Sequence, residues 1–237
     1  MTTIASNLQR VRERIAAACA AAGRDVTEVT LLAVAKTFGP DAARDAHAAG
    51  QRAFGENYIQ EAVEKMALLA DLPLEWHCIG PIQSNKTRLV ATHFHWAHTV
   101  DRLKIAQRLS EQRPAELPPL QVCVQVNIDG GASKSGVAPG EAVALARQVA
   151  VLPRLQLRGL MTIPESADSF EAQLAVHQKA RRLFDELRAE GLAVDTLSMG
   201  MTADLEAAVQ AGSTMVRVGT AIFGGRVYAT SSAPPSA

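Results

Sequence analysis

The sequence predicts an α/β fold, a single (β/α)8 TIM barrel with a leading N-terminal helix. The chain has 237 residues and 48% hydrophobic content, enough for the large core of a one-domain barrel or of two small domains. Short apolar runs alternate with helical patterns, which indicates a parallel sheet. About eight such units follow one leading helix, and that number fits a closed barrel better than an open sheet. No linker rich in proline, glycine or serine divides the chain, so we expect one domain.

The leading segment, residues 1–23, has the pattern of an amphipathic helix. Ile4, Leu8, Val11 and Ile15 recur at helical spacing, with charged residues between them. This pattern differs from the apolar stretch of a secretory signal. A transit peptide is the alternative, but Glu13 and the lack of a cleavage-like stretch argue against it. We therefore expect a cytoplasmic protein.

The predicted elements follow one another without long gaps. Strands are expected at 29–35, 52–57, 75–80, 95–100, 121–127, 157–163, 195–200 and 215–219. Helices are expected at 41–50, 58–70, 101–112, 141–152, 170–191 and 203–212. These elements place a barrel domain at 1–229. The tail 230–237 has nothing to bury and is expected to be disordered.

Charge and cysteine content exclude several classes of protein. Lysine plus arginine equals aspartate plus glutamate at 24 each, so no net field attracts nucleic acid or a membrane surface. A small, locally recognised ligand is the expected partner. Cys19, Cys78 and Cys123 are odd in number and lack C-x-x-C spacing, which argues against a disulfide framework or a structural zinc site.

The carboxyl ends of barrel strands meet at one mouth, where polar residues would form a ligand site. The residues at these predicted ends are Lys36, Asn57, His77, Gly80, Asn127, Thr162, Ser198, Gly200, Arg217, Gly219 and Thr220. The loops after the last two strands read SMGM (198–201) and VGTAIFGG (218–225). Their small residues would let backbone amides approach a phosphate, and Ser198 and Thr220 would add hydroxyl donors. Glycine-rich turns alone are weak evidence, and plain turns are the alternative.

Lys36 closes the apolar run VTLLAVAK and is the candidate for a Schiff base. A lysine held among apolar neighbours is more readily the neutral amine that condenses with an aldehyde. A surface lysine at a strand end is the alternative that spacing alone favours. Together with a phosphate-binding loop, however, an aldehyde-binding lysine indicates a phosphorylated aldehyde, and pyridoxal 5′-phosphate (PLP) is the obvious candidate.

Arg217 lies within the last strand, two residues before the predicted phosphate loop. It is placed to lie under the cofactor and face the pyridine nitrogen. A guanidinium only donates hydrogen bonds, so that nitrogen would stay unprotonated and the ring would be a weaker electron sink. This argues against aminotransferase chemistry, which normally uses a carboxylate at that position. The alternative is a structural pairing of Arg217 with a carboxylate across the barrel.

Long segments of the chain resemble a known family. The segments are LLAVAK, FGENYIQE, WHCIGPIQSNKTR, VNIDGGASKSG, GLMTIP and LSMGMTADLEAAVQAGSTMVRVGTAIFG. They resemble the pyridoxal phosphate homeostasis proteins, the YggS/PROSC group, from the first helix to Arg226. The resemblance implies a monomeric barrel similar to the N-terminal domain of alanine racemase, with PLP held as an internal aldimine and no established turnover.

The resemblance also implies roles for individual residues. Lys36 matches the Schiff-base lysine and Arg217 the partner of the pyridine nitrogen, while Asn57 and Met161 would flank the ring. The phosphate cup would consist of Ser198, Met199, Gly200, Gly219 and Thr220. The chain departs from many members at Ala35, where they have a serine.

Other candidate sites carry less weight. HFHWAH (93–98) puts three histidines in six residues, but His93 and His95 would share one strand face and His98 the other, without a nearby carboxylate. We expect no metal site there. His77 would either pack beside the cofactor ring or fill the barrel. Lys86 and Lys134 lie in basic loops where they would meet a phosphate or receive transferred cofactor, although solvated loop lysines are the simpler interpretation.

The sequence therefore predicts a PLP carrier or buffer with possible delivery to apoenzymes, not an enzyme with a catalytic residue set. An amino-acid racemase is the main alternative, but it needs acid/base groups on both faces of the α-carbon and Lys36 supplies one. The only tyrosines, Tyr58 and Tyr228, are not in a second domain of the kind that supplies the other in alanine racemase. A class I aldolase using Lys36 would fit the barrel but would not explain Arg217.

Overall fold

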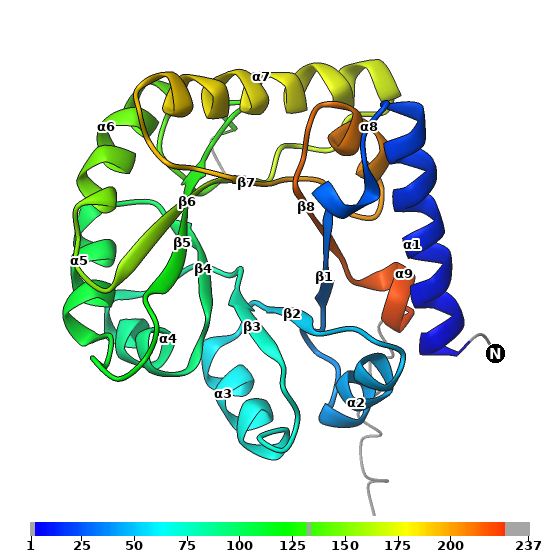
Figure 1. Cartoon of the computed structure of the whole chain (residues 1–237), viewed down its shortest axis with the longest axis horizontal. Coiled ribbons are helices and arrows are strands. Elements are labelled where there is room, and N and C mark those ends of the chain that lie inside the picture. The colour runs from blue at the N-terminus through cyan, green and yellow to red at the C-terminus, as the bar shows by residue number, and fades with distance from the viewer. Residues whose placement is uncertain (1–2, 132–133, 226–237) are drawn as a thin grey trace, which may run out of the picture.

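The computed structural model describes residues 3–131 and 134–225, and these form a closed barrel of eight parallel strands. The strands follow one another around the barrel in chain order, and β1 closes the ring by pairing with β8 (Figure 1). Their bounds are Thr30–Val34 (β1), Ala53–Glu56 (β2), Glu75–Cys78 (β3), Trp96–Val100 (β4), Leu120–Val126 (β5), Leu155–Thr162 (β6), Thr196–Ser198 (β7) and Met215–Val218 (β8). The predicted barrel is confirmed. The predicted tail at 230–237 lies outside the described residues.

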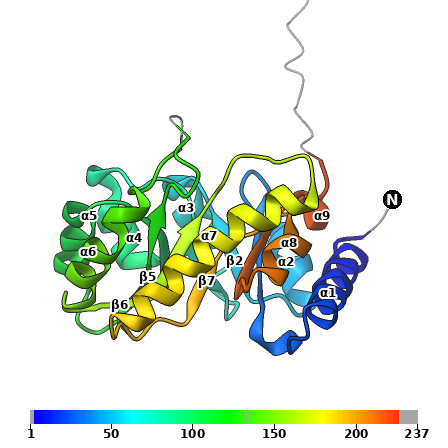
Figure 2. The same ribbon diagram turned by 90° about the horizontal axis from the view of Figure 1, so that it is seen from above.

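Helices surround the strands, as the alternating pattern predicted (Figures 1 and 2). They are Ile4–Ala21 (α1), Pro40–Ala48 (α2), Ile59–Leu68 (α3), Thr87–His93 (α4), Leu103–Gln112 (α5), Pro139–Ala150 (α6), Phe170–Ala189 (α7), Leu205–Gln210 (α8) and Thr220–Phe223 (α9). Two 3₁₀ turns, Val26–Glu28 (η1) and Ser84–Lys86 (η2), precede β1 and α4.

The region between β3 and β4 differs from its prediction. Residues 84–88, expected as a basic loop, form η2 and the start of α4, and His93, expected on a strand face with His95, ends that helix. His95 precedes β4 and accepts a hydrogen bond from the Trp76 amide at 3.0 Å. A seven-residue helix has little intrinsic stability, and packing of the buried Val90 and Ala91 stabilises it. Propensity and periodicity therefore gave no signal for it.

The leading helix α1 completes the outer ring. Because α9 spans only four residues, the outer face near the β8–β1 seam needs another cover, and α1 packs there against α8, α9 and α2. The Asn7 side-chain amide donates to the Ile222 carbonyl at 2.8 Å, and Arg14 pairs with Glu206 at 2.9 Å. The helix is thus an integral part of the barrel wall.

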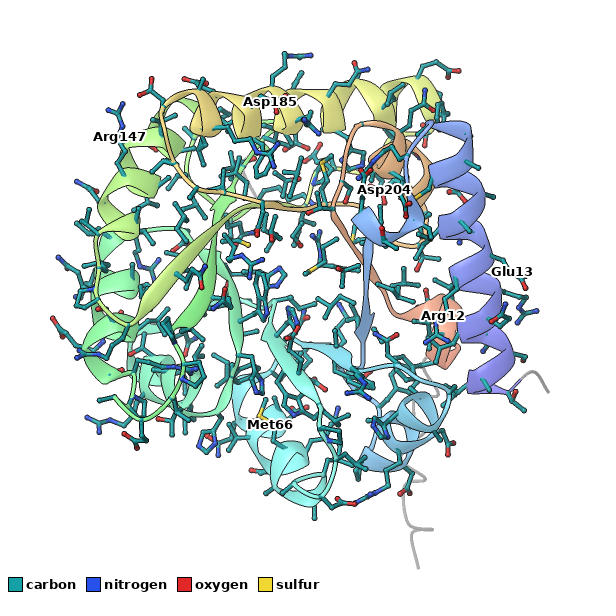
Figure 3. All side chains as sticks on the ribbon, in the orientation of Figure 1. Arg12, Glu13, Met66, Arg147, Asp185 and Asp204 are labelled. Carbon is teal, nitrogen blue, oxygen red and sulfur yellow. The ribbon has the colours of Figure 1, made fainter. Side chains whose placement is uncertain are left out.

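The strands separate an outer core from an inner one. Outward-facing side chains pack against the helices in a large apolar cluster that includes Ala33, Ala35 and Leu160. A smaller cluster fills the inside with residues that include Leu32, Val34 and Met161. Charged side chains such as Arg147 and Asp185 lie on the outer surface of the helices (Figure 3). Within the described residues, no helix is long and apolar enough to cross a membrane.

Candidate functional site

Lys36 lies at the mouth of the barrel because side chains alternate along β1. Leu32 and Val34 face the inside, whereas Ala33 and Ala35 face the helices, and Lys36 continues the inward series. It lines a cavity of about 320 Å³ at the carboxyl ends of the strands. The lining residues are Val34, Lys36, Asn57, Ile79, Ile163, Met201, Thr202, Ala203, Arg217, Gly219 and Thr220. The sequence-predicted residues Lys36, Asn57, Arg217, Gly219 and Thr220 are therefore brought together.

The backbone turns sharply just after the lysine. Thr37 has a φ of 68°, a left-handed conformation that is rare for a β-branched residue. Such strain is often found beside ligand sites, where the surrounding structure must hold it.

Asn57 is positioned by a close contact between two strand ends. A Cβ atom at Gly80 would lie 2.2 Å from the Asn57 carbonyl oxygen, so only glycine allows this approach. The side-chain oxygen of Asn57 is buried without a hydrogen-bond partner among the described residues. A buried polar atom is normally satisfied, and this one lies in the wall of the cavity, so it indicates a place for a ligand donor.

The loop after β7 is held in a fixed shape beside the cavity. Gly200 has a φ of +93°, and a Cβ there would lie 2.4 Å from that of Ala208. The Met201 amide donates to Asp204 at 2.7 Å, and Asp204 also bonds His177 at 2.9 Å. This hydrogen-bonded turn places Met201, Thr202 and Ala203 opposite the small residues that begin α9.

Two members of the predicted phosphate cup, Ser198 and Met199, make contacts within the protein. The Ser198 hydroxyl points into the barrel, where it contacts His98 at 3.0 Å and Arg217 at 2.8 Å. Met199 packs its side chain in the outer core, and its amide donates to the Met215 carbonyl at 3.1 Å. Strand alternation turns the Ser198 side chain toward the barrel interior, and its contact with a phosphate stays a prediction.

Arg217 is 4% exposed and lies at the floor of the cavity. Its Nη1 donates to Ser198 Oγ and its Nη2 to the Thr162 carbonyl, both at 2.8 Å. No carboxylate pairs with it among the described residues, so the alternative of a structural ion pair across the barrel is not observed. Burial lowers the pKa of Arg217 to about 10, which leaves the guanidinium charged at neutral pH.

His77 and Met161 are fully buried inside the barrel. His77 is fully buried between Glu75 and His98, with its ring stacked 5.1 Å from that of Trp96, and it fills the barrel. A contact of His77 with the cofactor stays a prediction. Met161 is fully buried in the inner cluster with Val34 and Ile79, and its contact with the ring stays a prediction.

The remaining candidates lie around the mouth. Asn127 donates to the Gly131 carbonyl at 2.9 Å and organises its own loop. Lys134 lines a second cavity of about 210 Å³, which shares Asn57 with the first. Lys86 contacts Gln60 at 3.2 Å on α3. A second PLP site at either lysine stays a prediction. The described residues hold no group of histidine, cysteine and carboxylate side chains suited to a metal.

A buried ion pair, Lys65 with Glu56, was not predicted from the sequence, and it lies close to the backbone just before Lys36. Lys65 Nζ lies 2.6 Å from Glu56 Oε1 and donates to the Ala35 carbonyl at 2.9 Å. Burial raises the pKa of Glu56, although Lys65 opposes the shift. The signal was available in α3, where Lys65 continues the buried series of Ile59 and Ala62 at three-residue spacing.

Comparisons with known proteins identify relatives of this chain along almost its whole length. The family described as alanine racemase, N-terminal domain, matches residues 4–227. A pyridoxal phosphate homeostasis protein of Pseudomonas aeruginosa is 61% identical over 228 residues, which cover 96% of this chain and 98% of the relative. One from Escherichia coli K12 is 54% identical over 231 residues, covering 96% and 99%.

Solved structures show the same barrel. PipY of Synechococcus elongatus PCC7942 with PLP bound has a TM-score of 0.81 and 37% identity, covering 94% of this chain and all of PipY. Alanine racemase of Clostridium difficile 630 has a TM-score of 0.71 at 16% identity, covering 92% of this chain and 57% of that protein. At that identity the likeness concerns the fold alone.

Proposed function

The chain belongs to the pyridoxal phosphate homeostasis protein family, and we propose that it holds PLP as a Schiff base on Lys36 in the cytoplasm. In this proposal the protein is a monomeric carrier or buffer that keeps a reactive aldehyde from other amines and delivers it to apoenzymes. The observation that carries the proposal is the single cavity lined by Lys36, Arg217 and Thr220.

The residues present fit such a cofactor. A cavity of about 320 Å³ lies within the usual range for small-molecule sites. Asn57 Oδ1 is buried and lacks a partner among the described residues, so it would accept a ligand donor. Gly219 and Thr220, with the turn from Gly200 onward, would hold the phosphate through backbone amides and the Thr220 hydroxyl. When bound, the cofactor supplies an aldehyde and an electron-accepting ring.

Arg217 distinguishes this site from one built for strong carbanion stabilisation. Its two Nη groups are held by Ser198 and by the Thr162 carbonyl, and it has no proton-accepting atom. Facing a pyridine nitrogen, it would donate a hydrogen bond and leave that nitrogen unprotonated. The site is therefore suited to holding the cofactor rather than to driving amino-acid chemistry.

The racemase alternative lacks a second acid/base group in the described structure. Of the two tyrosines, Tyr58 is 50% exposed and is not among the residues that line the cavity, and Tyr228 lies outside the described residues. Without a second base, a proton removed by Lys36 would return to the same face. We therefore propose that the protein has no substantial turnover.

Two assays on one preparation test the proposal. PLP-loaded protein should restore activity to a PLP-dependent apoenzyme, and L-alanine incubated with it should stay L by chiral chromatography. Lys36→Ala, loaded under the same conditions, should deliver little PLP. Racemisation near the median enzyme turnover of about 10 s⁻¹ would establish the racemase instead. Equal delivery by wild type and Lys36→Ala would remove the lysine from the proposal.

A further inference from the structure

A chain of hydrogen bonds crosses the inside of the barrel from one end to the other. Glu75 bonds His77 at 2.7 Å, His77 bonds His98 at 2.9 Å, and His98 bonds Ser198 at 3.0 Å. Arg217 completes it at 2.8 Å. Glu75, with a side chain 49% exposed, begins β3 at the base of the barrel, whereas Arg217 reaches the cavity at the mouth. We call these five residues the barrel relay.

The two ends of the barrel relay and the neutral form of its histidines determine the direction of every bond in it. The Glu75 carboxylate can only accept, so His77 donates to it from Nε2. Because burial keeps both rings neutral, His77 Nδ1 accepts from His98 Nε2–H, and His98 Nδ1 accepts the Ser198 hydroxyl proton. Arg217 can only donate, and Ser198 Oγ accepts from it. Both histidines are thereby assigned as neutral Nε2–H tautomers.

Burial supports the neutral form of both rings. It lowers the pKa of His77, although Glu75 raises it, and it lowers the pKa of His98 well below the usual value. Hydrogen bonding of His77 lowers the pKa of Glu75 and keeps this carboxyl group ionised. Neither histidine of the barrel relay therefore carries a second N–H proton, and the positive charge of Arg217 is the only one in the relay.

Other charged groups face the barrel relay at both ends. At the base, His95 and Arg158 interact with Glu75, and Arg158 is paired with Asp195 at 2.7 Å. Near the mouth, Asp204 and the buried thiol of Cys123 act on Arg217. None of these groups is hydrogen-bonded to a relay side chain among the described residues. Substituting one of them therefore changes the nearby charge without breaking a hydrogen bond of the relay, and such a variant can serve as a control.

We propose that Glu75, His77, His98 and Ser198 are positioning residues that orient Arg217 toward the ligand. Through the barrel relay, a carboxylate at the base of the barrel determines which atoms Arg217 contacts at the mouth. The contact of Arg217 with the cofactor rests on the function proposed above, whereas the relay itself exists in the ligand-free protein. The two parts can thus fail separately.

The first test needs no cofactor. Nitrogen-15 NMR of the ligand-free protein should show two histidines as Nε2–H tautomers that do not take up protons near pH 6. Glu75→Leu should remove the fixed tautomer of His77, while Glu75→Gln should retain it, because its amide oxygen still accepts. Asp195→Asn is the matched control, an exposed carboxylate at the same end of the barrel. An Nδ1–H tautomer at either ring in the wild type would overturn the relay.

The second test follows the bound chromophore. Glu75→Leu and Ser198→Ala should shift the absorption spectrum of PLP-loaded protein and weaken PLP affinity about three- to tenfold, the effect of one hydrogen bond. Glu75→Gln should restore both readouts, and Asp195→Asn should match the wild type. A wild type that does not load PLP would refute the proposed function and leave the NMR result to decide the relay. Loading with unchanged spectra and affinity in Glu75→Leu would refute the positioning role alone.

Discussion

Two buried cations, Lys65 outside the barrel wall and Arg217 inside it, are stabilised in different ways. Lys65 contacts a buried carboxylate directly, with Glu56 at 2.6 Å. Arg217 contacts a hydroxyl and a carbonyl oxygen, and the carboxylate of its relay lies at the far end of the barrel. A directly paired charge is largely neutralised where it sits, whereas a charge held by neutral groups still acts on its surroundings.

The different partners of Lys65 and Arg217 indicate that Lys65 serves mainly stability and Arg217 mainly ligand binding. Lys65 also donates a hydrogen bond to the carbonyl of Ala35, the residue before Lys36. The ion pair therefore stabilises the backbone beside the cavity. Arg217 keeps its positive charge directed at the cavity, where a ligand can use it. Substitutions should therefore affect mainly folding at Lys65 and mainly ligand binding at Arg217.

The largest effect on stability is expected at Lys65. Lys65→Met leaves Glu56 buried without its partner, which should lower the free energy of unfolding by about 3–5 kcal/mol. Replacing both residues, in Glu56→Leu with Lys65→Met, should recover most of that loss because no unpaired charge remains. Lys104→Met, at an exposed lysine of α5, is the control and should change stability by about 0.5 kcal/mol or less. Urea unfolding measures all three, and an equal loss at Lys104 would refute the comparison.

The next effect is the pH dependence that the relay histidines impose. Their folded pKa values lie below the unfolded value of 6.5, so below that pH the unfolded chain binds protons that the folded chain does not. The free energy of unfolding therefore decreases as the pH falls through 6.5, and it should be lower at pH 5.5 than at pH 7.5. Unfolding at both pH values tests this, and His98→Gln should reduce the loss. An unchanged loss in that variant would mean that His98 is not buried in its neutral form.

The smallest effect on stability is expected at Arg217. Arg217→Met removes a buried charge together with two hydrogen bonds, and these opposing contributions should change the free energy of unfolding by about 1 kcal/mol or less. Affinity for PLP should nevertheless decrease about ten- to a hundredfold, since a hydrogen bond from a charged donor is lost. A large loss of stability with unchanged affinity would make Arg217 a structural residue and remove the contrast with Lys65.

The sequence predicted the barrel because hydrophobic periodicity is a collective signal. Each strand of the inner ring is buried on both faces, so it appears as a continuous apolar run, and the alternation with helices then leaves few arrangements. The lysine and arginine of the site were found because they follow or interrupt such runs. The short helix α4 was missed, because packing rather than sequence pattern stabilises it.

Contacts inside the barrel depend on which way single side chains point. Ser198 was expected at a phosphate, and His77 either beside the ring or filling the barrel. Both side chains lie on the inward face of their strands and bond to His98, a contact that the sequence did not predict. A shift of one residue at a strand end reverses this orientation, and strand boundaries predicted from sequence are uncertain by at least one residue. Glu75 and His77 do share one face at two-residue spacing, but the partner on β4 comes from the three-dimensional structure.

Covalent attachment of PLP to Lys36 tests the central claim most directly. Loaded protein should show a visible absorption band that borohydride bleaches, and peptide mapping of the reduced protein should find the pyridoxyl group on Lys36. Lys36→Ala should stay unlabelled at that position and retain the fold, because a lysine at the barrel mouth contributes little packing. A label on Lys86 or Lys134 in the wild type, with Lys36 unmodified, would contradict the account.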